Sequence, residues 1–160
     1  MTHRVLIALD HSEGAWHAVE YVARVFGQIP GVEVTLLHIL VGSRRFARIL
    51  KSALEKIDPK TQQRLVVAWQ VEQEKNWNRL VRRARECLAQ AGIAPEAVTS
   101  KFFQRSYDVA DDILREAELS GCRTIVLGRR GLGTARALVL GSVSFKVAQQ
   151  FRQGVVTIVQ

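Results

Sequence analysis

The residues best suited to chemistry lie in a glycine-rich loop between a short apolar run and a helical stretch. Glycine leaves its backbone N–H group accessible and tolerates positive φ angles, and this loop holds four of them: Gly128, Gly131, Gly133 and Gly141. Ser142 follows at the expected start of a helix, where the first amides lack partners within the helix. Because such N-termini bind anions, the loop predicts a phosphate-binding site.

Two common glycine motifs do not account for this loop. The dinucleotide fingerprint GxGxxG follows a first strand, whereas the first expected strand here ends in Asp10, His11 and Ser12. The P-loop requires a Gly-Lys pair, and the sequence has none. Conventional dinucleotide hydride transfer and P-loop phosphoryl transfer are therefore disfavoured, while a nucleotide phosphate remains the expected ligand.

The elements that must position the loop alternate between strands and helices. Apolar runs predict five strands, namely Arg4–Leu9, Glu33–Leu40, Val98–Gln104, Thr124–Leu127 and Val155–Val159. Helical periodicity predicts helices over Glu13–Phe26, Thr61–Gln90, Val109–Ser120 and Ser142–Gln150. This alternation predicts an α/β fold, an open, Rossmann-like, five-stranded parallel sheet with helices on both faces. Ligands bind such sheets at the carboxyl ends of the strands.

Three features of the middle of the chain refine this expectation. Residues 44–56 have helical spacing and form either a short helix or a mobile connection. The long helix has an imperfect apolar face that includes Leu65 and Ala68, and a break near Asn76 is one alternative. Val98–Gln104 is less apolar than the other strands, so we expect it near an edge of the sheet.

Composition limits the class of protein. The 160 residues suit one domain spanning 1–160, and no apolar run reaches the roughly 20 residues of a membrane helix. Without a signal-peptide pattern, we expect a cytoplasmic protein with Cys87 and Cys122 as buried or half-buried free thiols. The histidines form no metal-binding cluster. The net charge of +8 is scattered over several elements, which favours a solvated surface over a nucleic-acid interface.

The loop and the strands together resemble a known family. The spacing Gly128-x2-Gly131-x9-Gly141-Ser142 matches the G-2x-G-9x-G-(S/T) signature of the ATP-binding branch of the universal stress protein family. The opening Val5–Glu13 resembles the family's first strand with its Asp and Ser. Further on, Leu36–Ile39 resembles the second strand, and both Ile125–Gly128 and the ending Val155–Val159 resemble later ones, so the likeness covers nearly the whole chain.

This resemblance implies the strand order 3-2-1-4-5, a bound ATP or other adenine nucleotide, and no catalytic residue. The positions that line adenine and ribose in the family correspond to Ala8, Leu9, Asp10 and Ile39. Those along ribose and phosphates correspond to Leu127, Gly128 and Gly131, and those of the phosphate cradle to Gly141, Ser142, Val143 and Ser144. A Mg²⁺ or Mn²⁺ ion would be carried by the phosphates. Family members commonly dimerise through the C-terminal strand, which predicts a homodimer through Val155–Val159.

The chain also departs from the family. Gly154 stands where the family often has proline, Gly133 is an additional glycine, and the segment from Gly42 to about Trp69 is long and basic. Asp10 and His11 are the evident candidates for a general base near the loop. We therefore expect a regulatory nucleotide-binding protein with a role in stress responses. A slow ATPase or phosphotransferase is the alternative, and a basic module that binds nucleic acid is a second one.

Overall fold

The computed structural model describes residues 2–42, 49, 52, 58–106, 108–129 and 140–160. Within these residues, five strands form one parallel sheet: β1 (His3–Ala8), β2 (Val32–Leu40), β3 (Val98–Gln104), β4 (Thr124–Gly128) and β5 (Val155–Val159). Their order is β3-β2-β1-β4-β5, which confirms both the predicted fold class and the strand order implied by the resemblance. The predicted helix over residues 44–56 lies largely outside the described residues.

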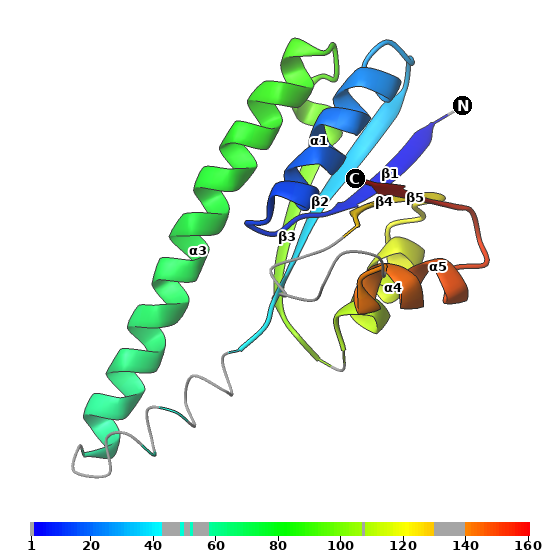
Figure 1. Ribbon diagram of the computed structural model, residues 1–160. Helices are drawn as coiled ribbons and strands as arrows, with labels where there is room; N and C mark the ends of the chain where they lie inside the picture. Colours follow the sequence, from blue (N-terminus) through cyan, green and yellow to red (C-terminus); the bar gives the residue numbers. More distant parts are fainter. Residues whose placement is uncertain (1, 43–48, 50–51, 53–57, 107, 130–139) are drawn as a thin grey trace.

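Helices cover both faces of this sheet (Figure 1). One face packs against α1 (Glu13–Phe26) and α3 (Pro59–Gln90), and the other against α4 (Val109–Leu119) and α5 (Ser142–Gln150). A short 3₁₀ turn, η1 (Pro95–Ala97), precedes β3. Side chains alternate along a strand, so Ile7 of β1 enters the first core while its neighbour Leu6 enters the second. This two-sided burial explains why the strands are apolar at successive positions.

Side-chain caps set the starts of α1, α3 and α4. Ser12, Asp58 and Asp108 accept hydrogen bonds from first-turn amides of α1, α3 and α4. Helix α3 begins two residues earlier than predicted, because Asp58 caps it and Pro59 suits its first turn. Helix α5 differs, since its N-cap is Gly141, which has no side chain to satisfy the first amides.

Helix α3 is continuous from Pro59 to Gln90, without the break considered near Asn76. Its second half enters the core through Trp77, Val81, Ala84 and Leu88. Its first half extends beyond the sheet, and the predicted inward positions Leu65 and Ala68 are exposed (Figure 1). The prediction was wrong there because 32 helical residues span about 48 Å, whereas strands of seven to nine residues span only about 23–30 Å.

Both edges of the sheet agree with the sequence analysis. The less apolar β3 lies at one edge, as predicted, and the C-terminal β5 lies at the other. A Cβ atom on Gly154 would lie 1.8 Å from the Arg123 carbonyl oxygen, which explains the glycine before β5. Cys87 is half-buried and Cys122 is buried, and both are free thiols, as predicted.

Candidate functional site

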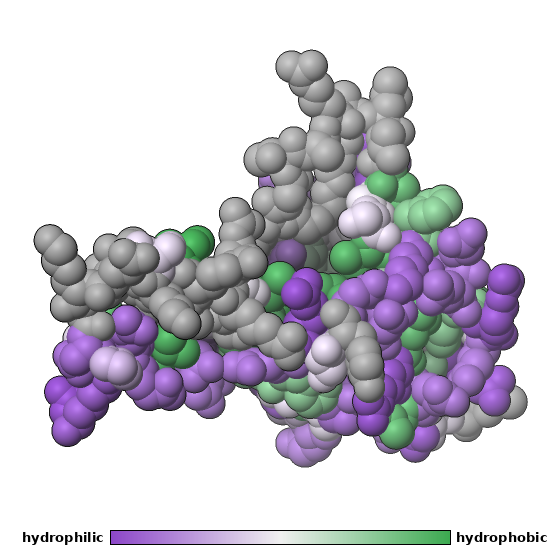
Figure 2. All heavy atoms as spheres, turned by 90° about the horizontal axis from the view of Figure 1, so that it is seen from below, coloured by the Kyte–Doolittle hydropathy of each residue, from purple (hydrophilic) through white to green (hydrophobic). Residues whose placement is uncertain are grey.

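Strands β1 and β4 bring two distant parts of the chain together at the carboxyl edge of the sheet. The strands pair in parallel, with Ala8 opposite Leu127. The turn that contains Asp10 therefore leaves the sheet beside Gly128, as the predicted ligand position between the two strands requires. Figure 2 views the molecule from below, the direction in which β2 runs in Figure 1, and shows apolar and polar surface side by side.

The N-terminus of α5 is fixed to this same edge. The Gly141 N–H donates to the Arg129 carbonyl at 3.1 Å, and the Ser144 hydroxyl donates to the Gly128 carbonyl at 2.9 Å. No side chain caps the helix, so the amides of its first turn, at Ser142 and Val143, lack partners within the helix. The uncapped end of α5 is therefore held beside the end of β4, where it can receive an anion.

An apolar cluster lies next to this helix N-terminus. The side chains of Ala8, Ile39 and Leu127 belong to the same hydrophobic core, and Val143 packs against it. Leu9 differs, because its side chain is 2% exposed and lies in the core on the opposite face of the sheet. Of these predicted site residues, Leu9 can therefore reach a ligand at this edge only through its backbone.

Asp10 is oriented by the first turn of α1. Its Oδ1 accepts hydrogen bonds from the Ser12 N–H at 2.8 Å and from the Ser12 hydroxyl. The Ser12 hydroxyl oxygen in turn accepts the Ala15 N–H at 3.2 Å, which caps the helix. Both of these bonds use one oxygen of the carboxylate, and they hold its other oxygen, Oδ2, in a defined direction.

Gly128 is required for close packing, the first of the two properties for which glycine suits this loop, and its φ angle is not positive. A Cβ atom at this position would lie 2.4 Å from the Gly14 carbonyl carbon and 2.7 Å from the Ala15 nitrogen. The end of β4 therefore contacts the start of α1 backbone to backbone. Gly141, with φ −58° and ψ 147°, is also outside the left-handed region.

The glycine-rich loop is only partly described, whereas the predicted phosphate cradle, Gly141–Ser144, is described in full. Gly131 and Gly133 lie outside the described residues, as do Arg130 and Arg136. Ser142 is exposed at the helix start, whereas Ser144 is buried and uses its hydroxyl to bind Gly128. The Ser144 hydroxyl therefore joins α5 to β4, and its role in the structure is to position the helix.

His38 is a residue of the site region to which sequence reasoning assigned no role. Its Nδ1 lies 2.8 Å from the Leu9 carbonyl oxygen, and its ring stacks on Trp77 and Phe102, with centroid distances of 5.4 Å to each. Burial lowers the pKa of His38, with a smaller lowering from His11, against the raising effects of the Leu9 carbonyl and Asp10. The neutral ring thus donates from Nδ1 and fixes the backbone before Asp10. The sequence did contain a signal for this burial, because His38 is two residues after the buried Leu36 and therefore lies on the same face of β2.

Two ion pairs hold α5 against α4. Lys146 Nζ lies 2.6 Å from Asp108 Oδ2 and 2.7 Å from Asp111 Oδ1. The Lys146 ammonium lowers the pKa of Asp108, and the hydrogen bonds to both carboxylates raise the pKa of Lys146. All three groups are solvent-accessible, so their main effect is to orient the two helices.

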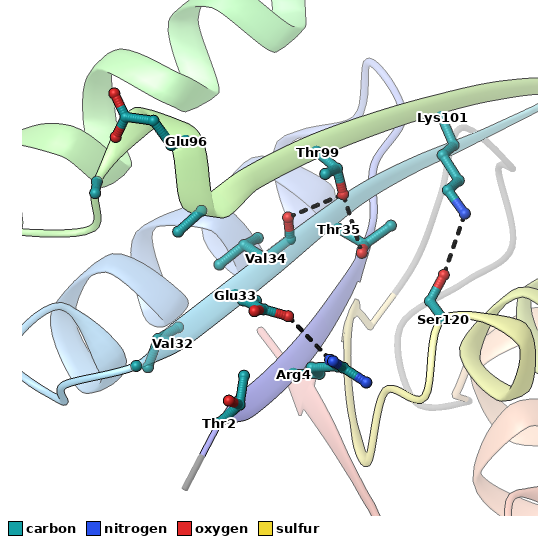
Figure 3. A pocket seen from close by; sticks show the side chains of 13 residues that line it. Thr2, Arg4, Val32, Glu33, Val34, Thr35, Glu96, Thr99, Lys101 and Ser120 are labelled. Atoms are coloured by element: carbon teal, nitrogen blue, oxygen red, sulfur yellow. Dashed lines mark hydrogen bonds and ion pairs between the residues drawn. The ribbon is translucent and has the colours of Figure 1, made fainter.

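A second depression lies over the amino-terminal parts of β1, β2 and β3 (Figure 3). It has a volume of about 820 Å³, and three of its charged side chains, Arg4, Glu33 and Lys101, are already paired. Arg4 Nε donates to Glu33 at 2.9 Å, and Lys101 Nζ donates to Glu116 at 2.6 Å and to Ser120 at 3.2 Å. The carboxyl edge, with its uncapped helix, is therefore the stronger candidate for a ligand site.

Two further observations concern the part of the chain that the structure describes. Within it, no group of three or more His, Cys, Asp or Glu side chains is arranged to hold a metal ion. No helix in that part is long and apolar enough to cross a membrane.

Comparisons with known proteins identify the family. A family model described as the Universal stress protein family matches residues 1–158. The chain is 26% identical, over 149 residues and 93% of each sequence, to universal stress protein YxiE of Bacillus subtilis. The chain therefore belongs to the universal stress protein family.

Solved structures share this fold. The structure of hypothetical protein MJ0577 matches with a TM-score of 0.76 at 20% identity, covering 99% of this chain and 96% of that one. A universal stress protein of Archaeoglobus fulgidus in complex with dAMP matches with a TM-score of 0.58 at 17% identity, covering 100% and 98%. Another universal stress protein, in complex with cAMP, matches with a TM-score of 0.61 at 16% identity, covering 99% and 97%.

The backbone contact at Gly128 leads to a prediction about stability. Gly128→Ala should lower the free energy of unfolding by roughly 1–3 kcal/mol without any ligand, because the added Cβ must displace the backbone of α1. Gly141→Val is the matched control, since its backbone conformation suits any L-residue and only the cap preference changes, at a cost of about 1 kcal/mol or less. Denaturant unfolding measures both. Equal losses would contradict the packing role of Gly128.

Burial of His38 predicts a pH dependence of stability. Its pKa is lower in the folded than in the unfolded protein, so the unfolded state binds more protons as the pH falls below about 6.5. The free energy of unfolding should therefore decrease from pH 7 to pH 5. His38→Asn keeps a donor toward Leu9 and should reduce this decrease, whereas His11→Asn, at an exposed position, should retain it. Urea unfolding at both pH values tests this, and an unchanged slope in His38→Asn would refute it.

Proposed function

We propose that this protein binds an adenine nucleotide, with ATP as the expected ligand, at the carboxyl edge between β1 and β4, and that it acts as a regulatory protein in stress responses. The observation that carries the proposal is the uncapped N-terminus of α5, held beside Gly128 by Ser144 and facing the edge where Asp10 emerges. First-turn amides and the positive end of the helix dipole suit a phosphate group. We assign this role to the amides of Ser142 and Val143.

The remaining parts of the edge suit a nucleoside. The cluster of Ala8, Ile39 and Leu127 offers an apolar surface for an adenine ring, and Asp10 Oδ2 can accept a hydrogen bond from a ribose hydroxyl. Support also comes from two relatives of the same fold whose structures contain dAMP and cAMP. We assign Gly131 to the phosphates by its place in the glycine spacing.

A divalent cation fits this proposal as a companion of the nucleotide. Mg²⁺ prefers oxygen ligands and commonly binds through phosphates with few protein groups. The described residues contain no cluster of three or more metal-binding side chains, which is compatible with an Mg²⁺ or Mn²⁺ ion held chiefly by the phosphates. The cation would neutralise phosphate charge at the helix N-terminus.

We favour binding over turnover as the function of the site. Hydrolysis needs a base that orients water toward the terminal phosphate. Asp10 already accepts two hydrogen bonds from Ser12, and His11 is exposed. The proposal also places the protein in the cytoplasm, where the free thiols Cys87 and Cys122 stay reduced.

A thermal-shift series tests nucleotide binding. ATP at about 100 times its Kd adds about 2.7 kcal/mol of stability, which corresponds to roughly 5–10 °C for a domain of this size. ATP, ADP, AMP and NAD should each be measured with and without Mg²⁺. Gly141→Val should abolish the shift, because its side chain would occupy the phosphate position while the backbone conformation stays allowed.

The same series separates the alternatives. No shift with any adenine nucleotide would refute the proposed site. Phosphate release above the buffer rate that disappears in Gly141→Val would instead establish an ATPase. Binding of nucleic acid with a steep loss of affinity at higher salt would favour the basic-surface alternative.

We further propose a homodimer through the edge strand β5. Its register with β4 directs the Val155 N–H and the Val159 carbonyl toward β4, so the N–H of the intervening Val156 points outward along the free edge. Val155 is 61% exposed, and an apolar edge strand without a partner favours association. A two-fold pairing of β5 with a second copy would cover this edge.

Light scattering tests the dimer. At micromolar concentration the mass should be at least twice the 17.9 kDa of the chain. Val156→Pro removes an outward N–H without removing a bond to β4, so the mass should fall by half while the circular dichroism spectrum is retained. A wild-type mass of 17.9 kDa would refute the dimer.

A further inference from the structure

We propose that the protruding first half of α3 is a second self-association surface, through which two copies pair as antiparallel helices with Ala68 at the two-fold axis. The surface is one stripe of the helix, here called the outer stripe: Arg64, Leu65, Ala68, Val71, Glu72 and Lys75. This association is separate from the nucleotide site and from β5.

The outer stripe faces away from the folded body. At about 100° per residue, the buried residues Trp77, Val81, Ala84 and Leu88 point roughly opposite to Ala68. Every residue of the outer stripe is exposed, with Leu65 at 38% and Val71 at 43%. Figure 1 shows this half of α3 extending beyond the sheet. Within the described residues, the outer stripe therefore covers no part of the hydrophobic core.

The same face of α3 is charged beside the folded body and partly apolar beyond it. Beside the body, it continues with Arg79, Arg82 and Glu86, which are exposed and charged, as a solvated helix face should be. Beyond the body, it carries Leu65 and Val71 instead. Leu65 and Val71 belong to neither hydrophobic cluster of the described residues, and an apolar patch rimmed by charge marks an interaction site.

The outer stripe is complementary to itself. An antiparallel pair centred on Ala68 places residues at equal distances on its two sides opposite each other. Arg64 then faces Glu72 of the partner, Leu65 faces its Val71, and both pairs occur twice because the arrangement is two-fold. Ala68 at the centre allows the helices to approach to about 8 Å.

Among the residues that the structure describes, neither the body nor the existing contacts oppose this pairing. Trp77 of the second copy lies level with Pro59 of the first, so the two bodies sit at opposite ends and on opposite sides of the helix pair. Glu72 accepts one hydrogen bond from Arg79 at 3.3 Å within its own chain. Both side chains are more than half exposed, at 64% and 53%, so exchanging this contact for Arg64 of the partner costs little.

The overlap, from residue 59 to residue 77, is about 28 Å long. An interface made by one such helix per copy is at the low end of specific interfaces, so association should depend on concentration. Combined with a β5 dimer, it would join dimers into larger closed or open assemblies. The choice of a second copy rests on the opposite charges placed equally on both sides of Ala68.

Cysteine cross-linking tests the axis directly. Under mild oxidation, Ala68→Cys should give at least five times more covalent dimer on a non-reducing gel than Gln63→Cys, because only a residue at the axis meets its own copy within disulfide distance. The two copies of residue 63 would lie about 15 Å apart along the helix pair. Wild-type protein controls for Cys87 and Cys122. Equal cross-linking of both variants, or none in Ala68→Cys, would overturn the proposal.

A charge exchange provides the second test. Arg64→Glu should at least halve the associated fraction in light scattering at a fixed concentration, and adding Glu72→Arg should restore it. These side chains are exposed, so the fold should persist, as circular dichroism can verify. An unaffected single variant, or a double variant without recovery, would refute the pairing. Val156→Pro, which acts on β5, should leave the Ala68→Cys cross-link intact, so a failure of either interface is recognised separately.

Discussion

The backbone contact between the end of β4 and the start of α1 is the constraint on which the candidate site depends. No side chain fits between Gly128 and Gly14, so the strand and helix are held at a fixed distance. The first turn of α1 orients Asp10 through Ser12, while the Gly128 carbonyl accepts the hydroxyl of Ser144 and so positions α5. The positions of Asp10 and of the α5 N-terminus therefore both depend on the close contact between Gly128 and Gly14.

Much of this arrangement could be predicted from local sequence. Strands that are apolar at successive positions imply burial on both faces, and glycines at a strand exit imply close approach, so the sheet and the close approach at Gly128 were predictable. The reason for Gly128 was not, because its clash is with Gly14, far away in sequence. Likewise, spacing alone could not show that the Ser144 hydroxyl is used inside the fold.

The wrong sequence-based predictions concern where an apolar side chain points, and not which residues are apolar. The strand pattern identifies Leu9 as buried, but only the packed helices show on which face its side chain lies. In α3, helical periodicity marks Leu65 and Trp77 alike as apolar, yet the sheet ends before it reaches Leu65. Periodicity reports that a face is apolar and cannot report whether the same chain, or a second copy, covers it.

His38 joins these two regions of the molecule. Its ring stacks on Trp77, at the point where α3 leaves the body, and hydrogen-bonds the carbonyl of Leu9, the residue before Asp10. A nucleotide that orders the backbone at Asp10 therefore acts next to the root of the protruding helix. If nucleotide binding changes the affinity of α3 for a second copy, linkage requires pairing of the helices to change nucleotide affinity by the same factor. Under the proposed function, nucleotide occupancy would in this way be converted into a change of assembly.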